Sequence, residues 1–90
     1  MNPWDADGFE WDEEHLARHA ISAWEVEEVF YRDPVWVADE RHGPDLWWMT
    51  GMTDRERCLT IVVQVKPQQR MLRAFTGWDC SERDYRRYSM

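Results

Sequence analysis

Histidines are the residues of this chain whose spacing comes nearest to metal chemistry. His15 and His19 stand four positions apart, a spacing that can place two imidazoles on one helix face. No HExxH pattern accompanies them and no third ligand is evident, so we predict no metal site and no cofactor. A structural role for His19, capping the end of a first helix, is the preferred interpretation.

The two cysteines could offer nucleophilic or redox chemistry. Cys58 and Cys80 lie 22 positions apart without a second pair, which gives neither a zinc framework nor a disulfide scaffold. We therefore expect two reduced thiols in or near the core.

Charge is divided unevenly along the chain, whose formal net charge is -7. Residues 1–45 hold 13 acidic residues against three arginines, a formal -10, whereas residues 46–90 hold 5 acidic against 8 basic residues, a formal +3. If the fold keeps the halves apart, the basic half could contact phosphate and the acidic half a basic partner. The alternative is a mixed, solvated surface.

Length and composition predict one domain that spans residues 1–90. An aromatic share of 14% and seven tryptophans are too rich for a disordered chain. No apolar run approaches the roughly 20 residues that span a bilayer, and the first residues lack the basic start of a signal peptide. A soluble, cytoplasmic protein without a membrane partner is expected.

Local patterns predict three helices and four strands. Ser22 and Glu25 form a capping box that begins the second helix, and Asp33-Pro34 ends it. Strands are indicated by β-branched and aromatic residues that alternate with polar ones. In chain order we expect helices at 12–19 and 22–33, strands at 35–37, 46–52, 58–65 and 70–76, and a basic helix at 81–88.

The turns determine how these elements combine. Short turns at 53–56 and 66–69 make the last three strands antiparallel neighbours, and Val62 places the third strand at the centre of the sheet. The predicted fold class is α+β, with two N-terminal helices packed on a small, mainly antiparallel four-stranded sheet and a short C-terminal helix.

Tryptophans are candidates for both core and binding roles. Trp47 and Trp48 point to opposite faces of a strand, so at least one should lie near the surface. Exposed indoles stack on unpaired bases or anchor protein interfaces. Trp11 and Trp24 are expected in the core, beside the apolar stripes of the helices.

The element order and several strings resemble the BrnT family of type II toxin-antitoxin toxins, which have the fold of the RelE-like ribonucleases. The match spans nearly the whole chain. The matching strings are Phe9-Glu10-Trp11-Asp12-Glu13-Glu14, Arg18-His19-Ala20-Ile21-Ser22, Val29-Phe30, Asp33-Pro34, Gly51-Met52-Thr53, Arg57, Leu59 to Val63, Arg73, and Glu82-Arg83 to Tyr88.

The resemblance implies a small, cytoplasmic, bacterial protein that cleaves RNA without a metal when it is free. It also implies a partner, a cognate antitoxin with a DNA-binding ribbon-helix-helix domain, in a hetero-oligomer or beside a homodimer of the toxin. At three positions the chain departs from the family. Ala20 stands where the family has a glycine, which strains or changes that turn, and Leu46 and Trp78 stand where it commonly has arginines.

Cleavage of RNA needs groups that move protons and cations that stabilise the phosphorane. From their places in the matched strings, Arg73 and Arg83 are predicted to converge on one phosphate. Further catalytic candidates are Arg57, His42 in an exposed loop, and Tyr88, for which a packed helix anchor is the alternative. The residues expected to bind RNA are Arg70, Arg86, Arg87 and Trp78.

Two functions follow. The first is a BrnT-like ribonuclease toxin, neutralised by its antitoxin, and the second is a catalytically inactive BrnT-fold protein that acts only through a regulatory partner. The missing arginines and the net charge of -7 favour the second, because affinity for nucleic acid rises with each cation placed on a phosphate. The otherwise intact strings and the basic second half favour the first. In either case we expect a basic partner segment, bound more weakly as salt rises.

Overall fold

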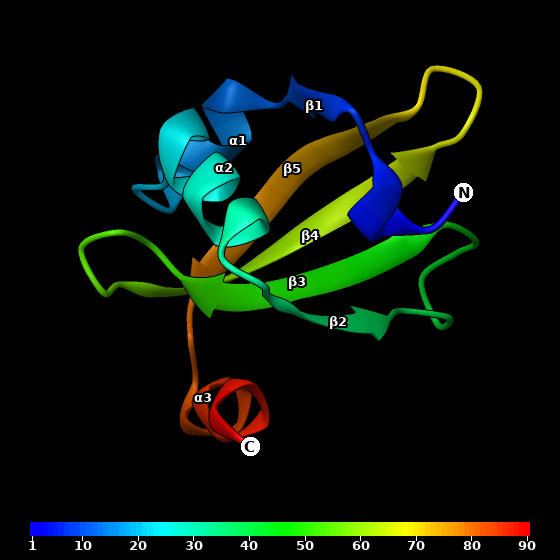
Figure 1. The fold of residues 1–90 in the computed structure, drawn as a ribbon. Coiled ribbons are helices and arrows are strands. Elements are labelled where there is room, and N and C mark those ends of the chain that lie inside the picture. The colour runs from blue at the N-terminus through cyan, green and yellow to red at the C-terminus, as the bar shows by residue number, and fades with distance from the viewer.

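A five-stranded mixed sheet with helices on both faces organises the chain (Figure 1). The computed structural model describes all residues, 1–90. In chain order the elements are a 3-10 turn (Pro3–Asp5), β1 (Gly8–Trp11), α1 (Glu13–Arg18), α2 (Ala23–Tyr31), β2 (Val35–Ala38), β3 (Leu46–Met52), β4 (Cys58–Lys66), β5 (Met71–Asp79) and α3 (Glu82–Ser89). The strand order is β1-β5-β4-β3-β2.

The predicted helices and hairpins are confirmed. Asp12 accepts a hydrogen bond from the backbone N–H of His15 at the start of α1, His19 is the C-cap of that helix, and Ser22 and Glu25 form the capping box of α2. The pairs β3–β4 and β4–β5 are antiparallel. An α+β fold with two N-terminal helices on one face of a sheet is therefore correct.

The number of strands is not correct, because β1 adds a fifth strand. It lies at the edge of the sheet and pairs in parallel with β5, with Phe9 opposite Leu72 and Trp11 opposite Ala74. Four residues are too few for a clear alternating pattern, and their partner strand lies near the other end of the chain. The sheet is therefore five-stranded and mixed, with one parallel pairing beside the antiparallel ones that the sequence predicts.

The core lies between the sheet and the pair α1 and α2. The helical side of this core consists of Leu16, Ile21, Val26 and Val29. These side chains pack against the residues of β4 that face the helices, such as Ile61. The opposite side of β4 is also covered in part, since Val62 is only 7% exposed. That burial confirms β4 as the central strand.

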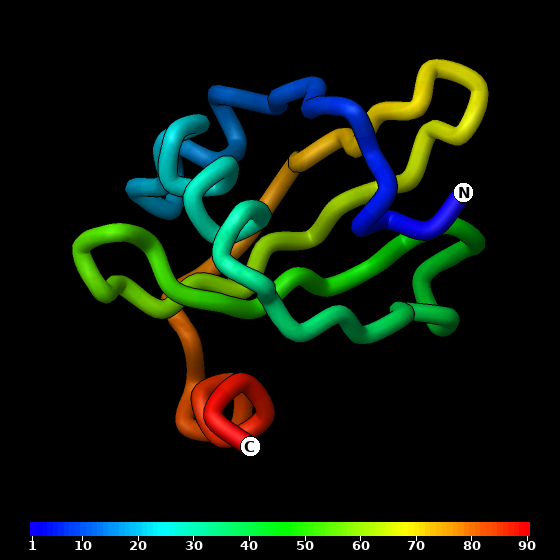
Figure 2. The backbone as a smooth tube through the Cα atoms, viewed as in Figure 1, coloured from blue at the N-terminus to red at the C-terminus, as the bar shows by residue number.

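The helix α3 lies on the other face of the sheet, below the strands in Figure 1. It follows directly on β5 and contacts β3. Its position leaves α1 and α2, which carry acidic residues, on one face of the sheet and the basic last helix on the other. Figure 2 shows how the first residues cross the helix-bearing side before the chain enters β1.

The cysteines form a disulfide, which corrects the expectation of two reduced thiols. Cys58 and Cys80 have Cα atoms 5.3 Å apart, and Cys80 N–H donates to the Cys58 carbonyl at 3.0 Å. They are the next pair of the β4–β5 ladder after Leu59 and Asp79. Sequence reasoning missed this pairing, which follows when the residues of β4 and β5 are paired outward from their hairpin turn until Cys58 meets Cys80. The bond ties the start of β4 to the residue before the N-cap of α3.

The turn between α1 and α2 places Ala20 in a backbone conformation that favours glycine. Ala20 has a φ of 55°, in the left-handed region. Its N–H donates to the Ala17 carbonyl and the N–H of Ile21 donates to the Leu16 carbonyl, the two bonds of a Schellman motif. Of the two alternatives for Ala20, a strained turn and a changed one, the structure has the strained one.

Trp24 corrects another expectation, because it is 68% exposed instead of lying in the core. It stands two residues before Val26, so roughly 200° of helical rotation separates it from the buried stripe. Trp11 is half-buried and packs against the core as expected. No helix is long and apolar enough to cross a membrane.

Candidate functional site

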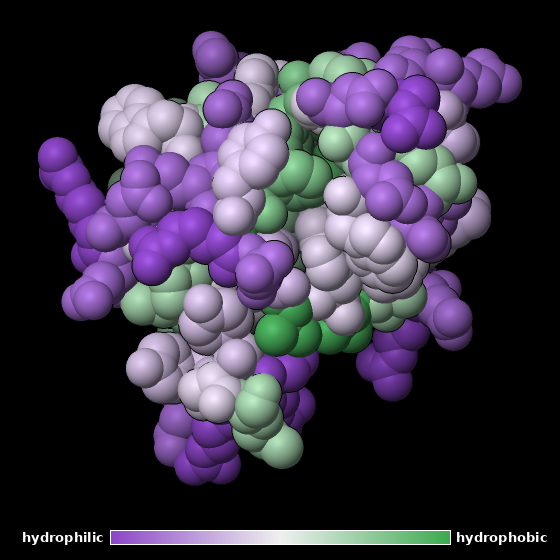
Figure 3. Space-filling model, viewed as in Figure 1, coloured by the Kyte–Doolittle hydropathy of each residue, from purple (hydrophilic) through white to green (hydrophobic).

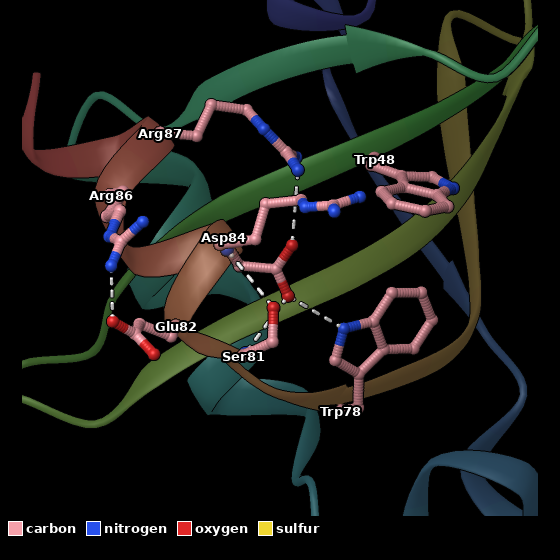
Figure 4. Close-up of a pocket in the computed structure, with 8 residues that line it drawn as sticks. Trp48, Trp78, Ser81, Glu82, Asp84, Arg86 and Arg87 are labelled. Carbon is pink, nitrogen blue, oxygen red and sulfur yellow. Dashed lines mark hydrogen bonds and ion pairs between the residues drawn. The ribbon is translucent and has the colours of Figure 1, made fainter.

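A hollow of about 680 Å³ lies between α3 and the sheet face that it partly covers (Figure 4). Two indoles form one side of it, and the helix supplies three arginines. In Figure 4, Trp48 and Trp78 stand opposite Arg86 and Glu82, with Asp84 and Ser81 between them. The lining residues are Trp48, Trp78, Ser81, Glu82, Arg83, Asp84, Arg86 and Arg87.

Asp84 holds the hollow together although it is a buried acid on a surface helix. It is 4% exposed and accepts hydrogen bonds from Trp78 Nε1 at 3.0 Å and from the Ser81 N–H at 3.1 Å. The Ser81 hydroxyl in turn accepts from the Asp84 N–H at 3.1 Å, which completes a capping box. Burial raises the pKa of Asp84, but the bonds from Trp78 and Ser81 outweigh burial and lower it below its usual value. The carboxylate is therefore ionised and fixed.

The second indole is fixed by another carboxylate. Trp48 Nε1 donates to Asp39 Oδ2 at 3.0 Å, and the ring meets that of Trp78 edge to face with centroids 5.3 Å apart. His42 Nδ1 lies 3.0 Å from both oxygens of Asp39, and this contact lowers the pKa of Asp39. The two rings thus form a preorganised aromatic wall.

His42 itself does not line the hollow. Its imidazole is held by Asp39 on the far side of Trp48 and is 71% exposed. Tyr88, the other proton-transfer candidate, is half-buried and is likewise absent from the lining. The hollow therefore contains no histidine or tyrosine.

The arginines of α3 differ in how much of their charge is free. Arg86 is paired with Glu82, and Arg87 with Asp84 at 3.3 Å. Arg87 also lies over the ring of Trp48, 5.9 Å from its centroid, and its Nη1 is buried without a partner. Arg83 is exposed and has no hydrogen bond or ion pair within the chain. The cation available to a ligand is therefore Arg83.

The structure does not bring Arg73 to this hollow. Arg73 lies near the start of β5, opposite Gln64, and its guanidinium is 3.7 Å from Asp12. Trp78 follows five residues later, roughly 16 Å along an extended strand. Arg73 and Arg83 therefore stand near opposite ends of β5.

Arg57 is used by the fold. Its guanidinium binds Asp79 through Nε at 2.7 Å and Nη2 at 3.2 Å, and Nη1 donates to Glu25 and to the Ala20 carbonyl. Nη2 also donates to the His19 carbonyl at 3.4 Å, so all five donors have partners. The bonds to Asp79 raise the pKa of Arg57. It joins α2 to the ends of β4 and β5.

Arg70, a predicted RNA contact, lies on the β4–β5 turn far from α3. It donates to Asp7 Oδ2 at 3.0 Å and to the Asp5 carbonyl at 2.9 Å. This pair ties the N-terminal turn to the sheet. Of the predicted RNA-binding residues, the structure brings together Trp78, Arg86 and Arg87.

Sequence reasoning missed the carboxylates that shape the hollow. Ser81 and Asp84 carry a visible signal, since serine followed three residues later by an acid before a helix is a capping box. The second role of Asp84, as acceptor for Trp78, depends on how α3 turns back from β5. The bond from Trp48 to Asp39 depends in the same way on the turn between β2 and β3.

This arrangement can hold a planar, unsaturated ring against the indoles and an anionic group against Arg83. No group of three or more His, Cys, Asp or Glu residues is placed to hold a metal ion. No protein-family model, no curated protein and no solved structure matches the chain. Only the residues of the site therefore indicate a function for this chain.

Proposed function

We propose that this chain is a BrnT-like toxin that binds single-stranded RNA in the hollow beside α3. The observation that carries the proposal is the pairing of two fixed indoles with an unpartnered arginine, Arg83. An unpaired base can stack on an indole for about 1–3 kcal/mol. A phosphate beside it would meet the exposed guanidinium of Arg83. An indole for the base and an arginine for the phosphate together fit a nucleotide better than either side chain does alone.

Metal-independent cleavage is the activity that the resemblance implies for this bound RNA. Arg83 would stabilise the charge that builds on the phosphorane. Proton transfer is the demanding part, because the carboxylates of the hollow are ionised or paired and His42 lies behind Trp48. For cleavage, RNA would have to extend from the hollow to His42 or Tyr88.

A second candidate function is RNA or partner binding without cleavage. The observation that favours it is the occupation of candidate catalytic arginines by the chain's own groups, above all the five satisfied donors of Arg57. In this version the protein regulates through a DNA-binding, antitoxin-like partner. The same hollow would then serve recognition alone.

The test measures the binding and the cleavage of one labelled single-stranded RNA. We expect Arg83→Ala to weaken binding about tenfold and to reduce the salt slope by about 0.7, the value for one lost phosphate contact on a single strand. Arg55→Ala is the matched control, because Arg55 is an exposed arginine on the β3–β4 turn, away from the hollow. It should change the affinity less than about twofold.

Gel analysis of the same RNA separates the two functions. Cleavage by the parent that is lost in Arg83→Ala, together with growth arrest on induction that the variant relieves, supports the toxin. Binding without cleavage or arrest supports the second function. If the parent does not bind RNA, or if Arg55→Ala is as damaging as Arg83→Ala, the hollow is not an RNA site. Arg73→Ala, made separately, reports whether that distant arginine takes part.

We place the chain in the bacterial cytoplasm with an antitoxin as partner. Disulfides are rare in that reducing compartment, so the bond between Cys58 and Cys80 weighs against this setting.

A further inference from the structure

An aromatic groove of about 650 Å³ lies on the sheet face that carries α1 and α2, opposite the α3 hollow. The N-terminal turn forms one side, and the end of α2 with the segment that leads into β2 forms the other. The residues that line it include Trp4, Phe30, Tyr31, Asp33, Pro34 and Trp36.

The rings of this groove support one another. Trp4 contacts Trp36 and Trp47 with centroids 6.4 and 5.9 Å away, and Phe30 meets Tyr31 edge to face at 5.0 Å. Even so, Trp4 is 50% and Tyr31 71% exposed. Figure 3 shows pale, weakly polar side chains at the centre of this side of the molecule with hydrophilic ones around them. The groove is thus preformed and accessible.

The charge around the groove is acidic. Asp33 lines it, Asp5 follows Trp4, and Glu27 precedes Tyr31 by one helical turn. All three carboxylates are exposed and have no ion pair within the chain. Arg32, the nearest cation in sequence, donates instead to the Thr53 carbonyl and pairs with Asp54. No basic residue lines the groove.

We propose that this groove is the docking surface for a cationic segment of a protein partner. Arginine or lysine side chains of the segment lie over the exposed rings of Trp4 and Tyr31 and pair with Asp33, while its apolar side chains fill the space beside Phe30. Charge argues against two other occupants, because the acidic rim repels phosphates and the same groove of a second copy brings the same acids.

This inference concerns a different face from the RNA hollow and holds whether or not the chain cleaves RNA. The probe is a short, fluorescein-labelled peptide of repeated Arg-Pro-Leu, and the matched probe has glutamate in place of each arginine. We expect the arginine peptide to bind with an affinity that falls as salt rises. The glutamate peptide should not bind.

Three variants locate the binding. Trp4→Ala and Tyr31→Ala should each weaken the arginine peptide about tenfold, as expected for aromatic anchors, and Asp33→Asn should flatten the salt dependence. Tyr31 is the safer change for folding because it is so exposed. Trp24→Ala is the matched control, because Trp24 is a tryptophan of α2 that is 68% exposed and lies outside the groove. This change should alter the affinity less than about twofold.

The proposal is overturned if the arginine peptide does not bind, or if Trp24→Ala weakens it as much as Trp4→Ala does. It is also overturned if sedimentation shows self-association that Trp4→Ala abolishes, because a second copy would then occupy the groove. Failure of RNA binding would leave this result unaffected, so the two proposals fail separately.

Discussion

Ala20 shows how one residue can work against an otherwise favourable turn. The Schellman bonds and the buried pair of Leu16 and Ile21 all require a left-handed residue between the first two helices. An L-residue with a Cβ costs about 1–2 kcal/mol in that region. The surrounding bonds evidently over-determine the turn, so the strain is retained instead of relaxed.

We expect Ala20→Gly to raise the free energy of unfolding by about 0.5–1 kcal/mol, since the relief of strain is partly offset by the greater entropy of glycine in the unfolded chain. Urea denaturation measures the change. Ala17→Gly is the control, because Ala17 lies inside α1. Glycine there should lower the free energy of unfolding by up to about 1 kcal/mol. If both changes destabilise, the left-handed turn is not the source of strain.

Arg57 is a residue type suited to catalysis, but all its donors bind groups of the chain itself. Its planar fork matches Asp79 on one side and the last carbonyls of the α1 turn on another. Such charge-assisted bonds are stronger than neutral ones, and their geometry suits arginine alone. These bonds are therefore a sufficient structural role for Arg57 in this chain.

At the scale of elements, α3 is held differently from α1 and α2. Those two helices bury apolar residues against the sheet, whereas the buried residue of α3 is the carboxylate of Asp84. The disulfide beside its N-cap limits how far it can move. The hydrogen bonds of Asp84 and the disulfide, more than apolar burial, thus hold α3 in place as one wall of the hollow.

How far the sequence predicts these elements depends on how local their causes are. The caps at Ser22 and Asp12 involve neighbours in sequence, so the helices were predicted nearly to the residue. The pairing of β1 with β5 and the bond between Cys58 and Cys80 depend on register between distant segments. The sequence predicted only part of the hollow: its arginines and Trp78 were candidate site residues, but the carboxylates that bind them were not.

The carboxylates that join elements make stability depend on pH. Hydrogen bonds from Arg57 lower the pKa of Asp79. Burial raises the pKa of Glu25, but the bonds from Ser22 and Arg57 outweigh it, and the net direction is downward, as it is for Asp84. A lowered pKa means that the folded state binds fewer protons than the unfolded state. The stability is therefore present above the ordinary values of 3.8 and 4.5 and is lost as the pH falls through the folded values.

We expect the free energy of unfolding to be level between about pH 7 and pH 5 and to fall steeply below about pH 4. Urea denaturation across this range measures it. In Asp84→Asn one linked proton is removed, so the slope in acid should be shallower by up to about 1.4 kcal/mol per pH unit. An unchanged slope would mean that Asp84 titrates alike in both states.

For the whole molecule, the sheet separates two surfaces of opposite character. The groove is built only from the acidic half of the chain, while α3, with Trp78 and Trp48, builds the hollow from the basic half. The molecule measures 33 × 27 × 23 Å, so the two surfaces lie farther apart than the screening length of about 10 Å in 0.1 M salt. A ligand in the groove should therefore have little electrostatic effect on a ligand in the hollow at that salt concentration.

A labelled single-stranded RNA and the arginine peptide should therefore bind one molecule together. Near physiological salt, saturating peptide should change the affinity for RNA less than about twofold. At about 0.01 M ionic strength the screening length grows to about 30 Å, so the charge that the peptide adds should reach across the sheet and tighten RNA binding several-fold. Because linkage is reciprocal, RNA should tighten the peptide by the same factor, which a second titration checks. Competition at every salt concentration would instead place both ligands on one surface, and the separation of the two faces would then have no functional meaning.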